Sequence, residues 1–241
     1  MNTLAKKIID AHGNLDAWRE FDSLRAKLKQ GGALWGLKGH AGKLDDTAVT
    51  VGLKEEWASH APFGPNGKVS VFRPDSVILQ DGAGQMLEEL RDPRASFAGH
   101  TLETPWSETQ LAYFAGCAMW TYLNMPFLLA RQGVVTETLS DWEENGETWQ
   151  RLQVTFPADV ATHSTVQTLY ADANGLLKRH DYDVEIAGNT PGAHYMSNYV
   201  EVQGFKFPTS RKIFPRGPDG RSMPEPLVVS IDLSEIQLTR G

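Results

Sequence analysis

The chain has 241 residues, of which 41% are hydrophobic and 22% charged, and its formal net charge is −7. These values are typical of a globular protein and exclude a disordered chain. The acidic balance argues against a nucleic-acid partner bound through its phosphates. One cysteine excludes an intrachain disulfide, and no run approaches the roughly 20 apolar residues of a membrane span. The length predicts one large domain, residues 1–241.

An amphipathic helix is predicted over residues 1–20, where Leu4 and Ile8 interleave with charged side chains. The His12-Gly13 pair is typical of a helix end. Because the segment has no apolar run of signal-peptide length, the chain as written is expected in the cytoplasm. A chain whose leader had been removed would look the same, and the alternative location is the periplasm.

Residues 22–91 predict a first set of strands, because apolar and polar side chains alternate in short runs between turn signals. The Gly31-Gly32 pair indicates a bulge or bend within the first long strand. The Glu55-Glu56 pair is interpreted as solvated charge at a strand end. The predicted strands span about 23–36, 47–57, 68–73, 76–80 and 85–91.

Residues 95–130 interrupt this alternation and predict a helical plug. Ser107, with Gln110 three positions later, resembles a capping box, and the helix is expected to stop near Pro126. The helix is apolar on nearly every side, and a helix of that kind is buried on every side. Cys117 lies within it, where burial favours an inert thiol.

Residues 134–240 return to alternation and predict a second strand set, joined by tight Asn-Gly turns that pair neighbours antiparallel. The two sets give about eleven or twelve strands, and a sheet this wide curls. The predicted fold is therefore mainly β: one strongly curved antiparallel half-barrel wrapped around the helical plug. The second set is expected at about 134–142, 147–156, 163–171, 175–186, 193–202, 204–214 and 227–238.

Three stretches carry a resemblance to a known family: AHGNLDAWREFDSLRAKLK near the start, ADANGLLKRHDYDV, and the hairpin YVEVQGFKFPTSRKI. This order of elements resembles the bacterial outer-membrane lipoprotein carriers, the LolA/LolB-like superfamily, and the mycobacterial lipoproteins that share their fold. The resemblance implies an open β-barrel with a helical lid that carries acyl chains or other apolar ligands. The sequence shows no export signal, and no functional residue of the carriers is placed on it, so the likeness concerns the fold.

Aromatic side chains supply the predicted binding surface, because small-molecule cavities are mostly apolar and aromatic, with few polar groups. A half-barrel of this width is hard to fill completely, which favours a cavity. The alternative for each of these side chains is packing in the core. The predicted aromatic ligand contacts are Trp35, Trp57, Phe72, Phe114, Trp120, Tyr122 and Phe127.

A polar cluster in the second strand set adds three further candidates for the binding site. His180 and Tyr182 fall on the apolar face of their strand, whereas Asp181 falls on the opposite face and so forms no triad with His180. If His163 and His194 also point inward, three histidines line one concave wall. His163, His180 and Tyr182 are therefore included as ligand contacts.

The sequence contains no metal-ligand spacing and no nucleotide, cofactor or hydrolase motif, so no metal, cofactor or catalytic residue is predicted. The favoured function is a non-catalytic carrier or sensor that binds an apolar or acyl-bearing small molecule or lipid. One alternative is an enzyme that uses a cavity histidine or tyrosine as acid–base group. Another is a scaffold that binds a protein along an open sheet edge.

Overall fold

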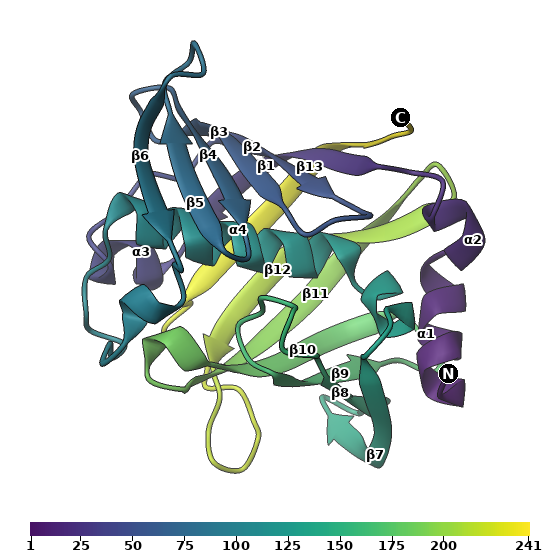
Figure 1. Ribbon diagram of the computed structural model, residues 1–241. Helices are drawn as coiled ribbons and strands as arrows, with labels where there is room; N and C mark the ends of the chain where they lie inside the picture. Colours follow the sequence, from purple (N-terminus) through teal and green to yellow (C-terminus); the bar gives the residue numbers. More distant parts are fainter.

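Thirteen strands form one continuous sheet in which each strand is antiparallel to its neighbours (Figure 1). The computed structural model describes residues 1–241. β1 (Ser23–Gly31) lies in the middle of the sheet, between β2 (Thr47–Gly52) and β13 (Val229–Thr239). The first and last strands of the chain are therefore paired, and the predicted antiparallel sheet is confirmed.

The rest of the sheet meanders outward from this centre in both directions and does not close into a barrel. The first half continues from β2 through β3 (Ala58–Phe63), β4 (Lys68–Arg73) and β5 (Ser76–Gln80) to the edge strand β6 (Met86–Arg91). The second half continues from β13 through β12 (Phe205–Pro215), β11 (Thr190–Val202), β10 (Leu177–Val184), β9 (Val166–Ala171) and β8 (Glu147–Thr155) to the edge strand β7 (Val135–Glu144).

α4 (Glu108–Asn124) carries the chain from one edge of the sheet to the other, and it therefore crosses the concave face (Figure 1). The predicted capping box is present: the Ser107 hydroxyl accepts from the Gln110 amide at 3.1 Å, and the Gln110 side chain accepts from the Ser107 amide at 2.9 Å. Every residue from 111 to 124 is buried. The predicted burial of this helix on all sides is confirmed.

The N-terminal segment predicted as one helix forms two, α1 (Thr3–His12) and α2 (Leu15–Trp18). The break falls at Gly13, whose φ is 151°, and a Cβ there would lie 2.4 Å from the ring of Phe205. A glycine is required because both the backbone conformation and the close approach exclude a side chain. The two helices cover one end of the half-barrel beside β12 (Figure 1).

Two further elements differ from the prediction. The first strand ends at Gly31, and α3 (Ala33–Leu37) follows it where a bend within a longer strand was expected. The strand predicted over 47–57 ends at Gly52, and β3 was missed. β3 contains Pro62, and a proline within a short run argues against a strand in sequence analysis.

The expectation that Glu56 is solvated is wrong. The side chain is 8% exposed, one carboxyl oxygen accepts from the Ala161 amide at 3.3 Å, and the other has no partner. Burial raises the pKa of Glu56 from 4.5 to about 8. The buried carboxyl is therefore protonated at neutral pH in the folded chain.

This protonation makes stability fall as pH rises. Between about pH 4.5 and 8 the folded chain binds more protons at Glu56 than the unfolded chain, so the free energy of unfolding decreases across that window. We expect Glu56→Gln, which keeps the acceptor for the Ala161 amide, to be roughly 2–4 kcal/mol more stable than wild type above pH 8 and similar at about pH 5. Urea unfolding at both pH values measures this. The exposed neighbour variant Glu55→Gln is the control, and equal stability of Glu56→Gln and wild type above pH 8 contradicts the assignment.

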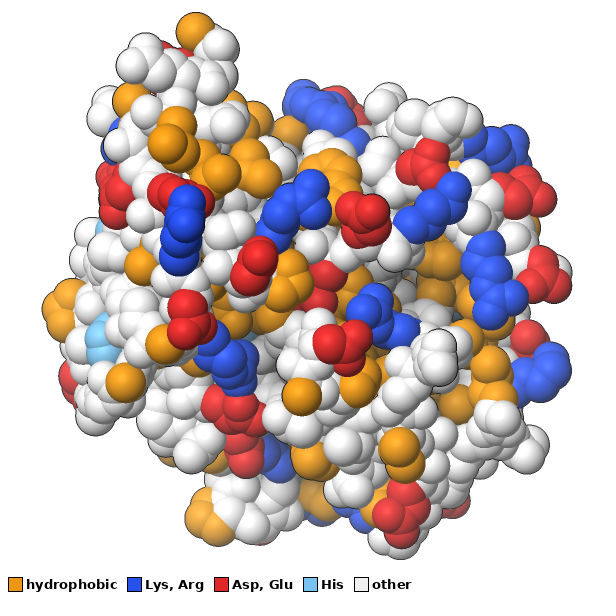
Figure 2. Space-filling view, in the orientation of Figure 1, with side chains coloured by type: hydrophobic (Ala, Val, Ile, Leu, Met, Phe, Trp, Pro, Cys, Tyr) orange, Lys and Arg blue, Asp and Glu red, His pale blue; other side chains and the backbone are white.

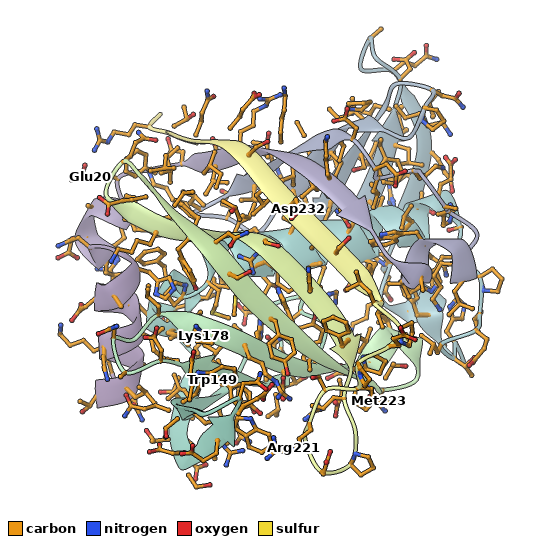
Figure 3. The ribbon with its side chains drawn as sticks, turned by 180° about the vertical axis from the view of Figure 1, so that it is seen from behind. Glu20, Trp149, Lys178, Arg221, Met223 and Asp232 are labelled. Carbon is orange, nitrogen blue, oxygen red and sulfur yellow. The ribbon has the colours of Figure 1, made fainter.

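The outer face of the second half of the sheet carries a buried ionic cluster. Arg179 donates to both carboxylate oxygens of Asp181, at 2.6 and 2.8 Å, and to Glu144 at 2.8 Å. It also donates to the carbonyl of Gly220, in the loop between β12 and β13. Figure 3 shows this loop, labelled at Arg221 and Met223, beyond the ends of the two strands that it joins. The side chains of Arg179 and Asp181 are fully buried although they point away from the concavity.

The surface carries charges of both signs. On the face seen in Figure 2, acidic and basic side chains are interspersed with apolar ones. That face therefore presents no single-sign patch that would attract a polyanion. None of the helices is both long enough and apolar enough to cross a lipid bilayer.

Candidate ligand-binding cavity

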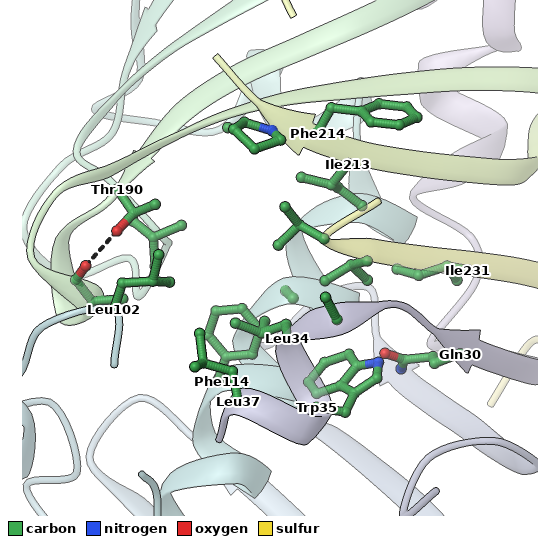
Figure 4. A pocket seen from close by; sticks show the side chains of 18 of the residues that line it. Gln30, Leu34, Trp35, Leu37, Leu102, Phe114, Thr190, Ile213, Phe214 and Ile231 are labelled. Carbon is green, nitrogen blue, oxygen red and sulfur yellow. Dashed lines mark hydrogen bonds between the residues drawn. The ribbon is translucent and has the colours of Figure 1, made fainter. Parts of the chain in front are cut away.

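A cavity of about 510 Å³ lies between the helices of the concave face and the second half of the sheet. Small-molecule sites commonly have volumes of roughly 300–1,000 Å³. Of the 25 residues that line this cavity, 19 are hydrophobic. Figure 4 shows Leu34, Trp35 and Phe114 on the side formed by α3 and α4, and Ile213 and Ile231 on the side formed by β12 and β13.

α4 separates the cavity from a closely packed region on its opposite side. Phe114, Ala118 and Tyr122, spaced four residues apart along one face of the helix, line the cavity. Gly116 faces the first half of the sheet, where a Cβ would lie 2.3 Å from the Cβ of Phe72. The helix therefore lies directly against β4 and leaves the open space on the side of β12 and β13.

The mouth of the cavity lies beside α3. Leu37 and Pro226 are exposed there, and Leu102 and Phe214 are half-buried. The hydroxyl of Thr190, also in the lining, donates to a backbone carbonyl at 2.6 Å (Figure 4). The rim is therefore apolar, and the hydroxyl of Thr190 already has its hydrogen-bond acceptor. An apolar molecule can enter without displacing a salt bridge.

Four of the predicted contact residues line this cavity: Trp35, Phe114, Tyr122 and Tyr182. Trp35 is fixed by a hydrogen bond from its indole nitrogen to the Gly31 carbonyl at 3.0 Å, and its ring meets that of Phe114 edge-on at 6.2 Å. These residues come from α3, α4 and β10, which are distant in sequence and meet at the cavity.

The other predicted aromatic contacts pack elsewhere. Trp57 packs against Gly52, and Phe72 packs against α4. The Trp120 indole donates to the carbonyls of Gly52 and Glu55, at 2.9 and 3.2 Å, on the side of α4 away from the cavity. Phe127 stacks on Trp18 of α2, with ring centroids 4.2 Å apart. Phe72, Trp120 and Phe127 belong to the packed core, and Trp57 is half-buried outside it.

Most of the cavity residues that the prediction lacks are aliphatic, because it includes only aromatic side chains and polar neighbours; Trp106 and Phe214 are aromatic and were missed as well. Many of the missed aliphatic residues lie in β12 and β13 or on the inner faces of α3 and α4. Period-two alternation in the last two strands was the available signal. The missed residues include Leu34, Leu37, Met119, Ile213, Val229 and Ile231.

A group of buried polar side chains, the inner polar cluster, lies at the inner end of the cavity. The hydroxyls of Tyr122 and Tyr182 hydrogen-bond to each other. His180 and His194 are opposite each other on β10 and β11, and His180 bonds to Gln167 at 2.5 Å. The cluster consists of Tyr122, His163, Gln167, His180, Tyr182, His194 and Arg211.

The three histidines lie together, as expected if His163 and His194 point inward with His180. His163 stacks on Phe114 with centroids 4.5 Å apart, and its ring lies 5.2 Å from that of Tyr182. The rings of His180 and His194 are 5.9 Å apart. None of the three lines the main cavity; Phe114, which stacks on His163, and the two tyrosines line it instead.

Burial keeps these histidines neutral. It lowers the pKa of His163 and His180 to about 3, and that of His194 well below its usual value. The positive charge of Arg211 lowers the pKa of His180 and His194 further. A guanidinium stays protonated in proteins, so Arg211 is the charged member of the cluster at neutral pH.

Acid–base chemistry and metal binding have little geometric support here. A histidine with a pKa of about 3 is a poor base near neutral pH, because catalytic groups work best with a pKa near the operating pH. No three histidine, cysteine, aspartate or glutamate side chains are arranged to hold a metal ion. Cys117 is buried, and burial raises the pKa of its thiol.

Comparison with known proteins finds similar folds among solved structures only. No family model matches the chain, and no curated protein matches it. Among solved structures, a LolA superfamily protein from Nitrosomonas europaea is similar over 99% of this chain and 93% of its own, with a TM-score of 0.53 and 12% identity. A DUF1329 family protein from Desulfovibrio piger is similar over 98% and 91%, with a TM-score of 0.54 and 10% identity.

These similarities confirm the fold that the sequence resemblance implied, an open antiparallel sheet of the LolA type. At 12% and 10% identity the likeness concerns the fold and transfers no ligand. The expectation of a cytoplasmic location gains no support from these neighbours.

Proposed function

We propose that the chain is a non-catalytic carrier or sensor that binds an apolar or acyl-bearing small molecule in the cavity between α4 and β12–β13. The supporting observation is the cavity itself: about 510 Å³ with a largely hydrophobic lining and an apolar mouth. Moving apolar surface from water into such a space is favourable by roughly 25 cal/mol per Å². The likeness to a LolA superfamily protein agrees with this use of the fold.

Filling the cavity tests the proposal. Ala118 lies on the cavity face of α4, and Ala118→Trp places an indole in the space that the ligand would occupy. A neutral naphthylamine dye that fluoresces in apolar surroundings is expected to bind wild type, and its affinity for Ala118→Trp is expected to fall by about tenfold or more. Fluorescence titration measures both affinities, with circular dichroism to verify folding.

Ala83→Trp is the matched control. It adds the same ring at the exposed turn between β5 and β6, away from the cavity, and should leave dye binding unchanged. Equal affinity of the dye for wild type and Ala118→Trp contradicts the proposal. Lipid extraction and mass spectrometry of the wild-type protein provide a second measurement, because an apolar passenger acquired during expression should be depleted in Ala118→Trp.

The enzymatic alternative has less support, because none of the three clustered histidines lines the cavity and burial lowers their pKa. The scaffold alternative rests on the open edges of the sheet, where Met86 and Leu87 of β6 are exposed. Nothing in the structure shows what would cover that edge. The cavity therefore favours the carrier or sensor function over the enzyme and the scaffold.

A further inference from the structure

Arg211 is a buried positive charge without an anionic partner. Its side chain lies in β12 on the concave face, and the residue is 3% exposed. The guanidinium donates to the Tyr122 carbonyl at 3.1 Å and lies 3.4 Å from Nε2 of His194, and its Nε has no partner. No carboxylate lies within ion-pair distance. A buried charge is ordinarily paired, because leaving it unpaired is costly.

The same sheet provides a comparison. Arg179 on the outer face is also buried, and it is paired with both Asp181 and Glu144. The groups that face Arg211 come from α1, α4, β10, β11 and β12, and all of them are neutral side chains. They are His12, Tyr122, Met125, Leu177, His180, Met196, Tyr199 and Pro208, which share a small space with Arg211, together with His194. Arg179 therefore has carboxylate partners within the protein, whereas Arg211 has none.

Arg211 lies one layer behind the inner end of the ligand cavity. Ile213, two residues along the same face of β12, lines the cavity, and so does Tyr122, whose ring centroid is 5.5 Å from the Arg211 guanidinium carbon. The space beside Arg211 is only about 10 Å³, room for a water-sized group. A phenol hydroxyl can donate to an anion on its cavity side. The hydroxyls of Tyr122 and Tyr182 bond to each other, which leaves one of their two protons free to donate. The inner end of the cavity thus combines a free donor with a positive charge behind it.

We propose that the cavity selects long-chain carboxylic acids, in which an apolar chain carries an ionised carboxylate head. The carboxylate lies at the inner end of the cavity, at the hydroxyls of Tyr122 and Tyr182, and the positive charge of Arg211 holds it there. This inference depends on the proposed function and narrows its ligand class. The chain of the acid occupies the apolar region between Phe114 and Ile231. The carboxylate supplies the anion that the protein itself lacks at this position, and the low local dielectric strengthens the attraction.

The test compares a long-chain fatty acid with its methyl ester, which has the same chain and no charge. In dye-displacement titrations near neutral pH, wild type is expected to bind the acid about tenfold more tightly than the ester. Arg211→Gln is expected to lose this preference and to keep its affinity for the ester. Lys212→Gln removes the same charge from the adjacent exposed position of β12 and should keep the preference.

The outcomes of these titrations distinguish failure of the inference from failure of the proposed function. Equal binding of acid and ester to wild type, or a preference that survives Arg211→Gln, overturns the inference and leaves the proposed function standing. Binding of neither ligand to wild type overturns the proposed function and the inference with it.

A second measurement needs no variant, in case Arg211→Gln fails to fold. The acid, labelled with ¹³C at its carboxyl carbon, is titrated while bound to wild type. The carboxylate resonance is expected to remain that of the ionised form below the pKa of the free acid, because a nearby positive charge favours ionisation. A bound carboxyl whose pKa is raised, as an apolar site alone would cause, overturns the inference.

Discussion

Trp120→Ala is expected to lower the free energy of unfolding by about 3–5 kcal/mol, the usual cost of removing a fully buried tryptophan. Its side chain is 1% exposed and fixes α4 to the loop between β2 and β3 through hydrogen bonds to two carbonyls. The truncation leaves a void where the indole was. It also removes the indole donor from the Glu55 carbonyl. The carbonyl of Gly52 keeps a second donor, Asn124, at 3.1 Å. Urea unfolding followed by circular dichroism measures the loss.

Trp120→Phe separates packing from hydrogen bonding. It keeps most of the ring and removes the indole donor, so a smaller loss of about 1–2 kcal/mol is expected. Dye affinity of Trp120→Phe should equal that of wild type, because the side chain faces away from the cavity. A stable Trp120→Ala that no longer binds the dye would contradict this placement and restore the residue as a ligand contact.

Arg179→Ala is expected to cost about 3–5 kcal/mol, because it removes the only cation paired with buried Glu144 and the nearest cation of buried Asp181, which keeps only Arg216 at 3.8 Å. The outer cluster would then hold two carboxylates in a site that the loop containing Gly220 shields from water. Arg221→Ala is the control: this arginine is exposed in the same loop, and its loss should change stability by no more than about 0.5 kcal/mol.

The pH dependence of the Arg179→Ala deficit identifies its cause. Burial already raises the pKa of Asp181, and Arg179 opposes that rise. Without the arginine the pKa of Asp181 rises further, so the folded variant takes up a proton as pH falls. The stability deficit relative to wild type should therefore be smaller near pH 5 than near pH 8. Urea unfolding at the two pH values measures it, and a deficit independent of pH indicates lost packing and contradicts the electrostatic explanation.

The architecture could be predicted because local patterns and tertiary structure agree. The apolar run around Trp120 lacks strand alternation and is capped by Ser107, and it forms the buried helix. The turn signals between alternating runs correctly gave an antiparallel sheet. α3 and β3 were missed because Gly32 and Pro62 are ambiguous signals whose outcome depends on contacts with distant strands.

The site could be predicted only in part, because sequence periodicity gives the face of an element and not what covers that face. His180 and Asp181 were correctly assigned to opposite faces. On the outer face, a loop some forty residues later in the chain covers Arg179, and periodicity gives no sign of this cover. Trp120 and Phe114 lie on one apolar helix, and only the path of the sheet decides which of them meets the cavity.

The central claim is that the concave side of the sheet holds an apolar guest between α4 and β12–β13. A crystal structure of the protein grown with a fatty acid that carries bromine on its chain tests this most directly, because bromine is located by its anomalous scattering. The claim predicts an anomalous peak inside the cavity, among Phe114, Ile213 and Val229. A structure in which side chains fill that space, or in which bromine is found only on the outer surface, contradicts it.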